Sequence, residues 1–419
     1  MPKFVINGQR PLAGEISVRG AKNAALKILP AALLSAEPIT IKNLPRIQDV
    51  DLSIKLLEEL GAEVDRGQDS ATIRIETITD SRISATANKL RASVVFTGPL
   101  LARMREVRFP HPGGCVIGAG TRPIDLFLEG FAALGAEVEE ADGYYSIRAD
   151  KLSGGEYFFT TISVTGTETL MMAAVLAEGK TILKNCALEP EIAALAAYLN
   201  SQGAKISGAG TATIVIDGVK RISAGEFTIM PDRIEAGTFA IMAAATKAEL
   251  TIRDCDPSHL EALLSIFSKI GVKFSAGKDY LTIRKSPDIS SYSVKTHEYP
   301  GFPTDLQSPY TVLMTQARGS AIIHETIYDR RLLFTDMLAQ MGADIIMCDP
   351  HRVVVNGPSK LYGRKLTSPD LRAGIAMIIA GLTAEGKTEI DNIYQIDRGY
   401  ERIDERLRSL GADITRQDD

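Results

Sequence analysis

Seven cationic residues stand at predicted helix starts, four of them at inner helices and three in the turns that enter outer helices. They are Lys22, Arg91, Arg122, Arg233, Arg331, Arg372 and Arg398. The first turn of a helix presents unpaired backbone N–H groups and a partial positive charge, so cations added there favour the binding of an anion. Arginine also offers a planar fork that matches the oxygens of phosphate and carboxylate. The pattern therefore predicts a ligand that carries several negative charges.

Each of these positions also has a purely structural interpretation. Asp232, Asp305 and Asp370 stand where a helix N-cap belongs, and capping alone could explain any of them. A single arginine is more often a partner in a surface ion pair than a ligand-binding group. The prediction of a binding site therefore rests on the recurrence of seven cations and on no single residue.

A glycine-rich loop surrounds one of the four cysteines. Residues 111–122 read HPGGCVIGAGTR, with four glycines around Cys115 and with Arg122 at the end. A free cysteine is by default a small buried apolar residue. A partly exposed thiol near cations can act instead as an acid or a nucleophile, so we expect Cys115 to act from a mobile lid. The other cysteines lie on or beside predicted strands and are assigned to structure: Cys186, Cys255 and Cys348.

An internal repeat has to position these residues. About every 70 residues an apolar stripe of helical spacing ends at a glycine, and a short strand follows. The six glycines are Gly61, Gly135, Gly203, Gly271, Gly342 and Gly411. Each repeat is expected to hold an amphipathic outer helix, an inner helix that is apolar nearly all round, and several short strands. A repeat of this size buries little core by itself, so the repeats must pack together.

Six such repeats predict an α/β protein with two inside-out α/β barrel domains of three repeats each. The first domain is expected to cover residues 20–228 and to carry the Cys115 lid loop. The second is expected to combine residues 1–19 with residues 229–419. The anionic ligand, and with it the active site, is expected in the cleft between the two domains.

Composition argues against several other classes of protein. The net charge of −5 does not favour general binding to nucleic acid or to an anionic membrane. The chain has no apolar run of membrane-spanning length, and its first residues, MPKFVINGQR, include no apolar signal region. The scattered cysteines are typical of free thiols in a reducing cytoplasm. Because the five histidines show no metal-ligand spacing, we expect neither a metal nor a cofactor.

A set of short motifs is more specific than these patterns. The motifs are GAKNAA (20–25), LRAS (90–93), PGGC (112–115), RPID (122–125), MPDRIEAGT (230–238), FPTDLQ (302–307), PDLRA (369–373) and IDRGYERI (396–403). Together they resemble the UDP-N-acetylglucosamine 1-carboxyvinyltransferase family of enolpyruvyl transferases, from about residue 3 to the C-terminus. The resemblance implies two inside-out barrels of three repeats. It also implies transfer of the enolpyruvyl group of phosphoenolpyruvate to the 3-hydroxyl of UDP-N-acetylglucosamine with release of phosphate, the first committed step of peptidoglycan synthesis.

The resemblance also implies roles for individual residues. Catalysis would involve a proton donor to the methylene carbon that can also hold a covalent adduct (Cys115), a proton acceptor for the sugar 3-hydroxyl (Asp305) and a phosphate clamp (Lys22, Arg122 and Arg398). Arg331 and Arg372 would neutralise the carboxylate of phosphoenolpyruvate and the cleft. The remaining expected contacts to the two substrates are Asn23, Arg91, Pro123, Ile124, Asp125, Leu126, Ile327 and Asp370.

Three other interpretations remain open. The sister enzyme 5-enolpyruvylshikimate-3-phosphate synthase has the same six repeats but lacks the PGGC cysteine. A DNA sliding clamp also repeats helices and strands, but it needs cations along its helix faces, whereas the predicted inner helices are bare of charge. A catalytically silent homologue that binds sugar nucleotide is favoured by the apparent insertion of Gly120 and Thr121 in the loop. The presence of Cys115, Lys22 and Asp305 argues against it.

Overall fold

The computed structural model describes residues 2–110, 124–141 and 143–418, and it divides into two compact units. The described residues of 20–230 form what we call the first unit. Residues 2–19 and 231–418 form the second unit. The chain therefore leaves the second unit after its first two strands and returns to it after residue 230.

The helices and strands of the first unit are, in chain order, α1 (Lys22–Ala31), β3 (Ile39–Lys42), α2 (Gln48–Glu59), β4 (Glu63–Arg66), β5 (Ser70–Arg74), α3 (Thr97–Met104), β6 (Glu106–Pro110), α4 (Asp125–Ala133), β7 (Glu137–Ala141), β8 (Tyr144–Arg148), β9 (Glu156–Phe158), α5 (Val164–Ala174), β10 (Lys180–Lys184), α6 (Pro190–Ser201), β11 (Lys205–Ser207), β12 (Thr213–Asp217) and β13 (Gly225–Thr228). Among its described residues the strands form three separate sheets, with the orders β13-β3-β5-β4, β6-β8-β7 and β11-β12-β10-β9.

The elements of the second unit are β1 (Lys3–Asn7), β2 (Ala13–Ser17), α7 (Arg233–Ala245), β14 (Glu249–Arg253), α8 (Glu261–Ile270), β15 (Phe274–Ala276), β16 (Tyr280–Ile283), β17 (Val294–Lys295), α9 (Gln307–Thr315), β18 (Gly319–His324), α10 (Thr335–Gln340), β19 (Asp344–Asp349), β20 (Arg352–Gly357), β21 (Lys365–Thr367), α11 (Leu371–Thr383), β22 (Lys387–Asp391), α12 (Tyr394–Asp397), α13 (Ile403–Ser409) and β23 (Asp413–Gln417). Its described strands form three sheets, ordered β15-β16-β14-β2, β17-β18-β20-β19 and β21-β22-β1-β23.

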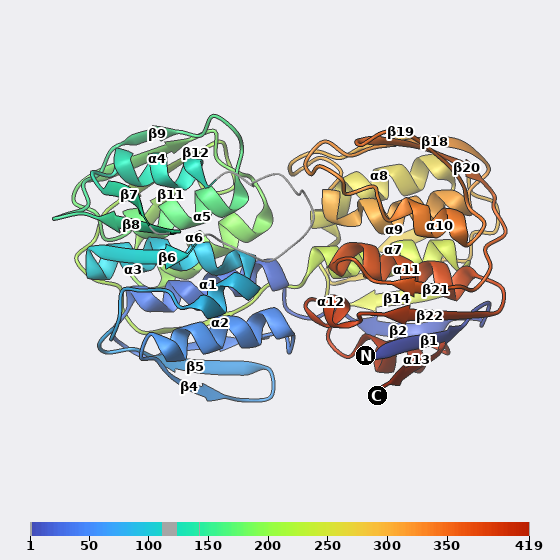
Figure 1. Cartoon of the computed structure of the whole chain (residues 1–419), viewed down its shortest axis with the longest axis horizontal. Helices are drawn as coiled ribbons and strands as arrows, with labels where there is room; N and C mark the ends of the chain where they lie inside the picture. Colours follow the sequence, from blue (N-terminus) through green and yellow to red (C-terminus); the bar gives the residue numbers. More distant parts are fainter. Residues whose placement is uncertain (1, 111–123, 142, 419) are drawn as a thin grey trace. The chain divides into compact units, whose positions relative to one another are not determined.

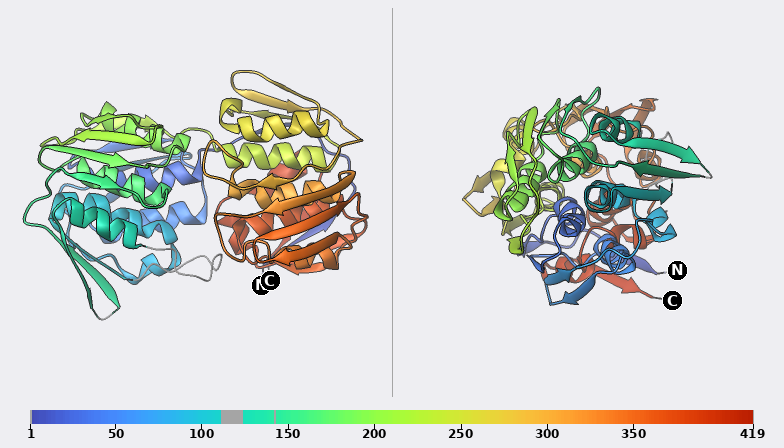
Figure 2. Two further views of the ribbon diagram at one scale, coloured as in Figure 1. Left: turned by 90° about the horizontal axis from the view of Figure 1, so that it is seen from above. Right: turned by 90° about the vertical axis from the view of Figure 1, so that its left-hand side faces the viewer.

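Each unit has helices inside and sheets outside, as Figures 1 and 2 show. In the second unit α9 packs against both α7 and α11. Every residue of α7 and of α9 is buried, because each of these helices packs against other helices and against strands of the unit. The outer helix α8, by contrast, buries one stripe of apolar residues and exposes the rest. This arrangement, with the helices surrounded by sheets, confirms the predicted inside-out α/β fold.

The glycine that closes each repeat has the conformation that the sequence predicted. All six have a positive φ, between 86° and 103°. This left-handed region costs glycine nothing, which is why it so often follows the last turn of a helix. The same glycine therefore turns the chain out of the outer helix and into the next strand in every repeat.

Two details of the inner helices differ from the sequence prediction. The inner helices are not bare of charge, because α1 buries Lys27 and α5 buries Glu168. Arg91 does not open an α-helix: it begins a 3-10 segment, Arg91–Phe96, and α3 starts only at Thr97. A similar 3-10 turn, Thr304–Leu306, precedes α9.

Candidate active site

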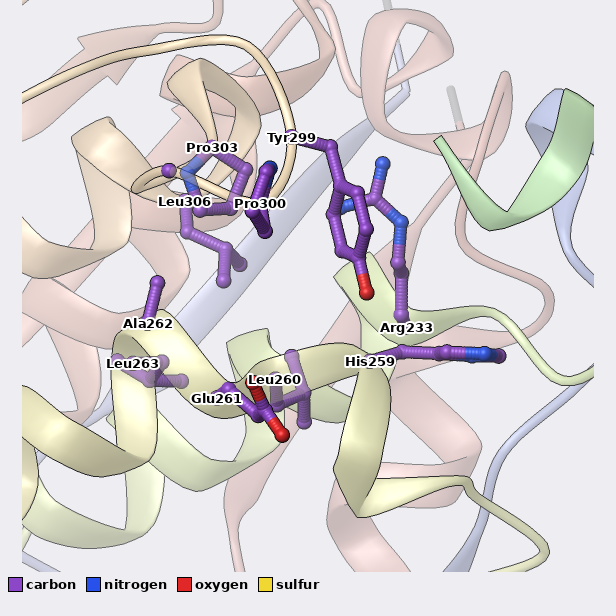
Figure 3. Close-up of a pocket in the computed structure, with 11 residues that line it drawn as sticks. Arg233, His259, Leu260, Glu261, Ala262, Leu263, Tyr299, Pro300, Pro303 and Leu306 are labelled. Carbon is purple, nitrogen blue, oxygen red and sulfur yellow. The ribbon is translucent and has the colours of Figure 1, made fainter. Parts of the chain in front are cut away.

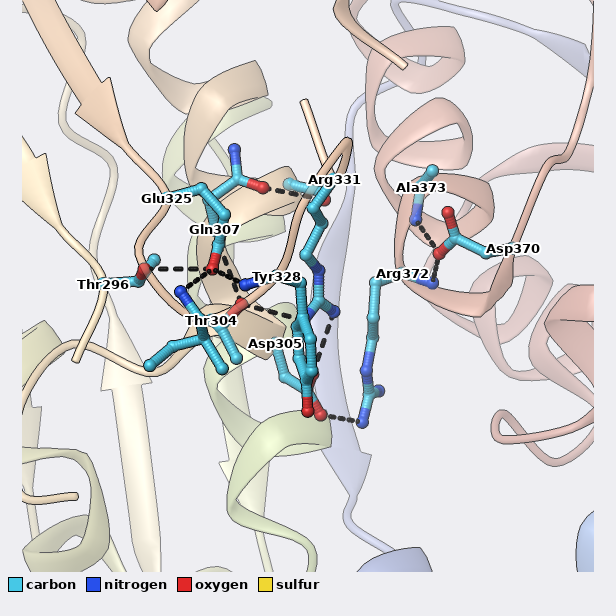
Figure 4. A network of polar contacts seen from close by, with 12 residues as sticks. Thr296, Thr304, Asp305, Gln307, Glu325, Tyr328, Arg331, Asp370, Arg372 and Ala373 are labelled. Carbon is cyan, nitrogen blue, oxygen red and sulfur yellow. Dashed lines mark hydrogen bonds and ion pairs between the residues drawn. The ribbon is translucent and has the colours of Figure 1, made fainter. Parts of the chain in front are cut away.

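A carboxylate held between two arginines lies at the start of the inner helix α9 (Figure 4). The Oδ1 atom of Asp305 accepts a hydrogen bond from Arg331 Nη2 at 2.9 Å, and its Oδ2 atom accepts one from Arg372 Nη2 at 2.7 Å. The arginine side chains are only 3% and 7% exposed, whereas that of Asp305 is 24% exposed. The carboxylate is therefore open to a ligand, and the cations behind it are fixed by the protein.

The two arginines decide the charge of this carboxylate. Burial by itself would raise the pKa of Asp305, but the charges and hydrogen bonds of Arg372 and Arg331 hold that pKa well below its usual range. The effect is mutual: burial would lower the pKa of Arg372, but Asp305, together with Tyr400 and Asp232, raises it above its usual range. Asp305 is therefore an anion at neutral pH as long as both arginines remain bound to it.

Each arginine is held at a second point. Arg331 Nη1 donates to the Thr304 hydroxyl at 2.8 Å, and the guanidinium lies 5.1 Å from the centre of the Tyr328 ring. Arg372 Nη1 donates to the hydroxyl of Tyr400 at 3.3 Å. An arginine held at two points loses little further freedom when it binds an anion, which makes it a good anchor.

The structural interpretation holds for two of the three predicted N-cap aspartates. Asp232 caps α7, accepting hydrogen bonds from the backbone of Ile234 and Glu235. Asp370 caps α11 in the same way: its Oδ1 atom accepts hydrogen bonds from the backbone N–H groups of Arg372 at 2.7 Å and of Ala373 at 3.0 Å. Asp305 makes no side-chain cap of this kind and turns to the arginines instead. Of these three described aspartates, the one that does not cap a helix is therefore Asp305, the expected proton acceptor.

In the first unit, Lys22 begins α1 and pairs with a carboxylate that the sequence did not single out. The Lys22 Nζ atom lies 2.8 Å from Asp49 Oδ2, and the two side chains are 10% and 3% exposed. Asp49 stands in the first turn of the outer helix α2, where a negative charge is stabilised by the helix dipole. Asn23 follows Lys22 in the same turn of α1. The start of α1 therefore presents one ammonium group that is already neutralised in part.

The other predicted site residues are distributed as follows. Ile124 and Leu126 are buried around the start of α4, and Asp125 in the same turn is exposed. Ile327 donates its backbone N–H to Glu325 Oε1 at 2.8 Å. Arg398 directly follows α12 and donates to Gln395. Cys115, Arg122 and Pro123 lie outside the described residues.

Not all of the seven cations occupy helix starts. Of the six that the structure describes, Lys22, Arg233 and Arg372 lie in the first turn of an α-helix, and Arg91 begins a 3-10 segment. Arg331 and Arg398 lie in turns that precede α10 and α13. The helix-dipole argument therefore applies to the first three only.

Arg233 occupies surroundings of its own (Figure 3). Its guanidinium lies over the Tyr299 ring, 5.4 Å from the ring centre, in a small pocket that is also lined by His259 and Leu306. A cation over an aromatic face is stabilised by the ring quadrupole. Arg233 thus has a structural partner that the sequence could not assign to it.

Two of the three described cysteines are buried thiols. Burial raises the pKa of Cys186 and of Cys255 to about 11, so both remain protonated and unreactive. Cys348 lies exposed on β19. Among the described residues, no cluster of three or more His, Cys, Asp or Glu side chains could hold a metal ion, and no helix is long and apolar enough to cross a membrane.

Comparison with known proteins places the chain. A family model described as EPSP synthase (3-phosphoshikimate 1-carboxyvinyltransferase) matches residues 6–407. The UDP-N-acetylglucosamine 1-carboxyvinyltransferase of Koribacter versatilis (strain Ellin345) is 44% identical over 421 residues, covering 99% of this chain and 96% of that protein. A relative of the same name from Desulfatibacillum aliphaticivorans is 45% identical over 419 residues, with 99% and 100% coverage. The chain belongs to the UDP-N-acetylglucosamine 1-carboxyvinyltransferase family.

Solved structures agree on the fold of this carboxyvinyltransferase family member. The enolpyruvyl transferase NikO from Streptomyces tendae matches with a TM-score of 0.90 at 22% identity, over 99% of both chains. An EPSP synthase from Acinetobacter baumannii matches with a TM-score of 0.76 at 16% identity, over 100% of both chains. At such identities the likeness concerns the fold alone. The predicted enolpyruvyl transferase fold and the predicted family are both confirmed, and the sliding-clamp interpretation is wrong.

Proposed function

We propose that the chain transfers the enolpyruvyl group of phosphoenolpyruvate to the 3-hydroxyl of UDP-N-acetylglucosamine and releases phosphate, as in the first committed step of peptidoglycan synthesis. Relatives that carry the name of this reaction match the chain over nearly its whole length. The geometric observation that supports it best is Asp305 between Arg331 and Arg372. That arrangement combines a group that can accept a hydroxyl proton with cations that can bind an anion.

Substrate itself would convert Asp305 into a base. With both arginines bound to it, Asp305 is too weakly basic to take a proton from a hydroxyl. When the carboxylate of phosphoenolpyruvate binds Arg331 and Arg372, part of their positive charge is neutralised, and the pKa of Asp305 must rise. Asp305 would therefore become a proton acceptor only after phosphoenolpyruvate has bound, which links proton removal to the presence of both reactants.

The reaction requires an acid and a phosphate clamp in addition to this base. As the sugar oxygen bonds to C2 of phosphoenolpyruvate, its proton goes to Asp305, and Cys115 gives a proton to the C3 methylene carbon. Loss of a C3 proton with the phosphate group then restores the double bond of the enolpyruvyl ether. Lys22, Arg122 and Arg398 would stabilise the phosphate as it leaves, so no metal or cofactor is needed for that charge.

The sugar nucleotide would contact the first turn of α4 and the segment that leads to Arg331. Arg122, Pro123, Ile124, Asp125, Leu126 and Ile327 are the residues proposed for it. Asn23, Arg91 and Asp370 complete the proposed substrate contacts. These groups come from both units, so a single active site that uses the two of them is part of this proposal. A cytoplasmic location likewise stays a prediction.

The test is phosphate release from phosphoenolpyruvate, measured with and without UDP-N-acetylglucosamine. We expect the wild type to release phosphate only when the sugar nucleotide is present. Cys115→Ser should lose most of this activity, and fosfomycin, as a thiol-directed probe, should inactivate the wild type by alkylating that residue. Cys348→Ser is the matched control, because it removes an exposed thiol that has no proposed role.

Two outcomes would contradict the proposal. Phosphate release that does not depend on the sugar nucleotide would exclude the transfer reaction. Binding of UDP-N-acetylglucosamine without any turnover would favour the silent homologue, and deletion of Gly120 and Thr121 would then be the first variant to examine.

A further inference from the structure

In five repeats of the described chain, a central strand of the sheet pairs in parallel with an edge strand. The residue that follows this central strand can be compared among the five repeats. In each of them, the residue after the parallel edge strand donates its backbone N–H to the carbonyl of the last residue of the central strand. The five pairs are Val18–Arg253, Phe159–Lys184, Ile229–Lys42, Thr296–His324 and Ser368–Asp391, at 2.9 to 3.0 Å. The residues that follow the central strands are therefore structural equivalents: Asn43, Asn185, Asp254, Glu325 and Asn392.

Four of these equivalents share one conformation. Asn43, Asn185, Asp254 and Asn392 have φ values between 53° and 58°, in the left-handed region that asparagine and aspartate tolerate better than other side chains. Each of the three asparagine amides donates to the carbonyl of the residue after the edge strand, at 2.8 to 2.9 Å. The usual purpose of this position is thus to fix the end of a parallel strand pair.

Glu325 is the exception among the five. It follows β18, it does not have a positive φ, and its side chain is completely buried. Its Oε1 atom accepts hydrogen bonds from the Thr296 hydroxyl (3.1 Å) and from the backbone nitrogens of Ile327 (2.8 Å) and Tyr328 (3.1 Å). Its Oε2 atom accepts one from the Thr304 hydroxyl at 2.8 Å. Burial of a carboxylate costs free energy unless hydrogen bonds compensate for the lost water. Here neutral donors from three segments of the chain supply those hydrogen bonds.

The hydrogen bonds continue from Glu325 to the candidate base (Figure 4). Because the Thr304 hydroxyl donates its proton to Glu325, its lone pairs are left for Arg331 Nη1, which lies at 2.8 Å. Arg331 Nη2 in turn donates to Asp305. Glu325 thus fixes the orientation of the Thr304 hydroxyl, which binds Arg331 Nη1. It also binds the backbone N–H of Ile327.

We propose that Glu325 is a positioning residue: through Thr304 it holds Arg331 in place while Asp305 exchanges its arginine partners for substrate. The inference rests on the proposed function. When the Asp305–Arg331 bond weakens on substrate binding, an arginine held only by Asp305 would be free to move. The second anchor at Thr304 keeps the guanidinium where it can bind the anionic substrate.

The experiment compares Glu325→Gln, Thr304→Val and Thr304→Ser for phosphate release at varied concentrations of each substrate. Glutamine has only one acceptor oxygen. When that oxygen keeps the backbone N–H groups of Ile327 and Tyr328, the NH2 group faces the Thr304 hydroxyl and cannot accept its hydrogen bond. Valine removes the hydroxyl altogether. We expect both changes to lower kcat/KM by about 10- to 100-fold, mainly through a higher KM for phosphoenolpyruvate, since small displacements of a binding group have effects of that size. Thr304→Ser keeps the hydroxyl and should stay within about threefold of the wild type.

Non-additivity distinguishes positioning from a general loss of structure. Because Glu325 and Thr304 act through one chain of hydrogen bonds, the double variant Glu325→Gln/Thr304→Val should be no worse than the more damaged single variant. A change that only reduces the folded fraction would lower the amount of active enzyme and leave KM unchanged. Glu385→Gln is the matched control, a carboxylate paired with Lys360 at the surface.

A readout without turnover separates this inference from the proposed function. In arginine-labelled protein, the side-chain NMR signal of Arg331, assigned with Arg331→Lys, should shift in Glu325→Gln and in Thr304→Val but not in Glu385→Gln. If the wild type releases no phosphate and these shifts occur, the proposed function fails and the link from Glu325 to Arg331 stands. Unchanged KM values, additive losses or an unshifted Arg331 signal in the variants would overturn the inference. If Glu325→Gln fails to fold, the comparison of Thr304→Val with Thr304→Ser decides.

Discussion

Two carboxylates near the starts of inner helices show how differently the two units treat a negative charge. In the second unit, Asp305 is bonded to two arginines and remains partly exposed. In the first unit, Glu168 lies one turn into α5, is completely buried, and has Lys27 Nζ at 3.3 Å from its Oε2. The first carboxylate can meet a ligand, whereas the second is closed off from water.

The pKa values of the two carboxylates move in opposite directions. Burial raises the pKa of Glu168 to about 7: Lys27 opposes the rise, while Glu191 and Glu189 add to it. Burial acts in the same direction on Asp305, but two guanidinium groups reverse it. The difference teaches that burial does not decide the charge of a carboxylate by itself. The number of cations that bond it, set against the anions around it, decides.

The largest expected effect breaks the second half of this comparison. Asp305→Asn removes the proton acceptor and leaves Arg331 and Arg372 facing a neutral amide. We expect kcat for phosphate release to fall by about 10²- to 10⁴-fold, the usual contribution of general base catalysis. Stopped assays with saturating substrates would measure it.

Asp349→Asn provides the control for that variant. Asp349 is also paired with an arginine, Arg352, and this pairing lowers its pKa too, but it lies on the outer strand β19. Loss of that carboxylate should leave kcat within about twofold, because a surface ion pair contributes little. Equal losses in both variants would show that any arginine-paired aspartate matters and that Asp305 has no special role.

The next effect tests Glu168 through the pH dependence of stability. Because the pKa of Glu168 is higher in the folded chain than the ordinary value of 4.5, its protonated form contributes stability that is complete below about pH 4.5 and is lost as the pH rises through about 7. In the wild type we expect this titration to lower the free energy of unfolding by up to about 3 kcal/mol between these two pH values. Glu168→Gln should abolish that loss. Urea unfolding of both proteins at several pH values would measure the difference.

Glu178→Gln is the appropriate comparison for Glu168→Gln. Glu178 lies in the same unit but is exposed and paired with Lys151. Its removal should leave the pH dependence of the wild type unchanged. Parallel pH curves for the wild type and Glu168→Gln would contradict the raised pKa and remove the contrast with Asp305.

The repeated framework was accessible from the sequence because it depends on local signals. The glycine at the end of each outer helix, such as Gly61, has a positive φ because the chain turns out of the helix at that residue. This requirement does not depend on distant parts of the chain. The same holds for the caps of α7 and α11, where Asp232 and Asp370 bond backbone groups two and three residues away. Such features follow from short spacings, so a single sequence suffices to predict them.

Partners that are distant in the sequence were not accessible in this way. The pairing of Lys22 with Asp49 and that of Lys27 with Glu168 depend on how separate helices pack, which no spacing reveals. Arg91 opens a short 3-10 segment in place of the predicted α-helix, and such a segment has no sequence signature of its own. Glu325 had a signal that could have been used: it stands where most other repeats have Asn or Asp.

The smallest expected effect concerns the second anchor of Arg372. The Tyr400 hydroxyl lies 3.0 Å from the Thr238 hydroxyl and 3.3 Å from Arg372 Nη1. Tyr400→Phe removes both contacts without changing the ring, and we expect it to lower the free energy of unfolding by about 1 kcal/mol. Since Arg372 keeps its bond to Asp305 at 2.7 Å, kcat should change by less than about threefold, against the larger effect expected for Thr304→Val at Arg331.

Tyr362→Phe, which removes a hydroxyl from a more exposed tyrosine, controls for the loss of a phenol group. A loss of activity in Tyr400→Phe as large as that in Thr304→Val would mean that both arginines depend equally on their second anchors, and Glu325 would then hold no special place in the site.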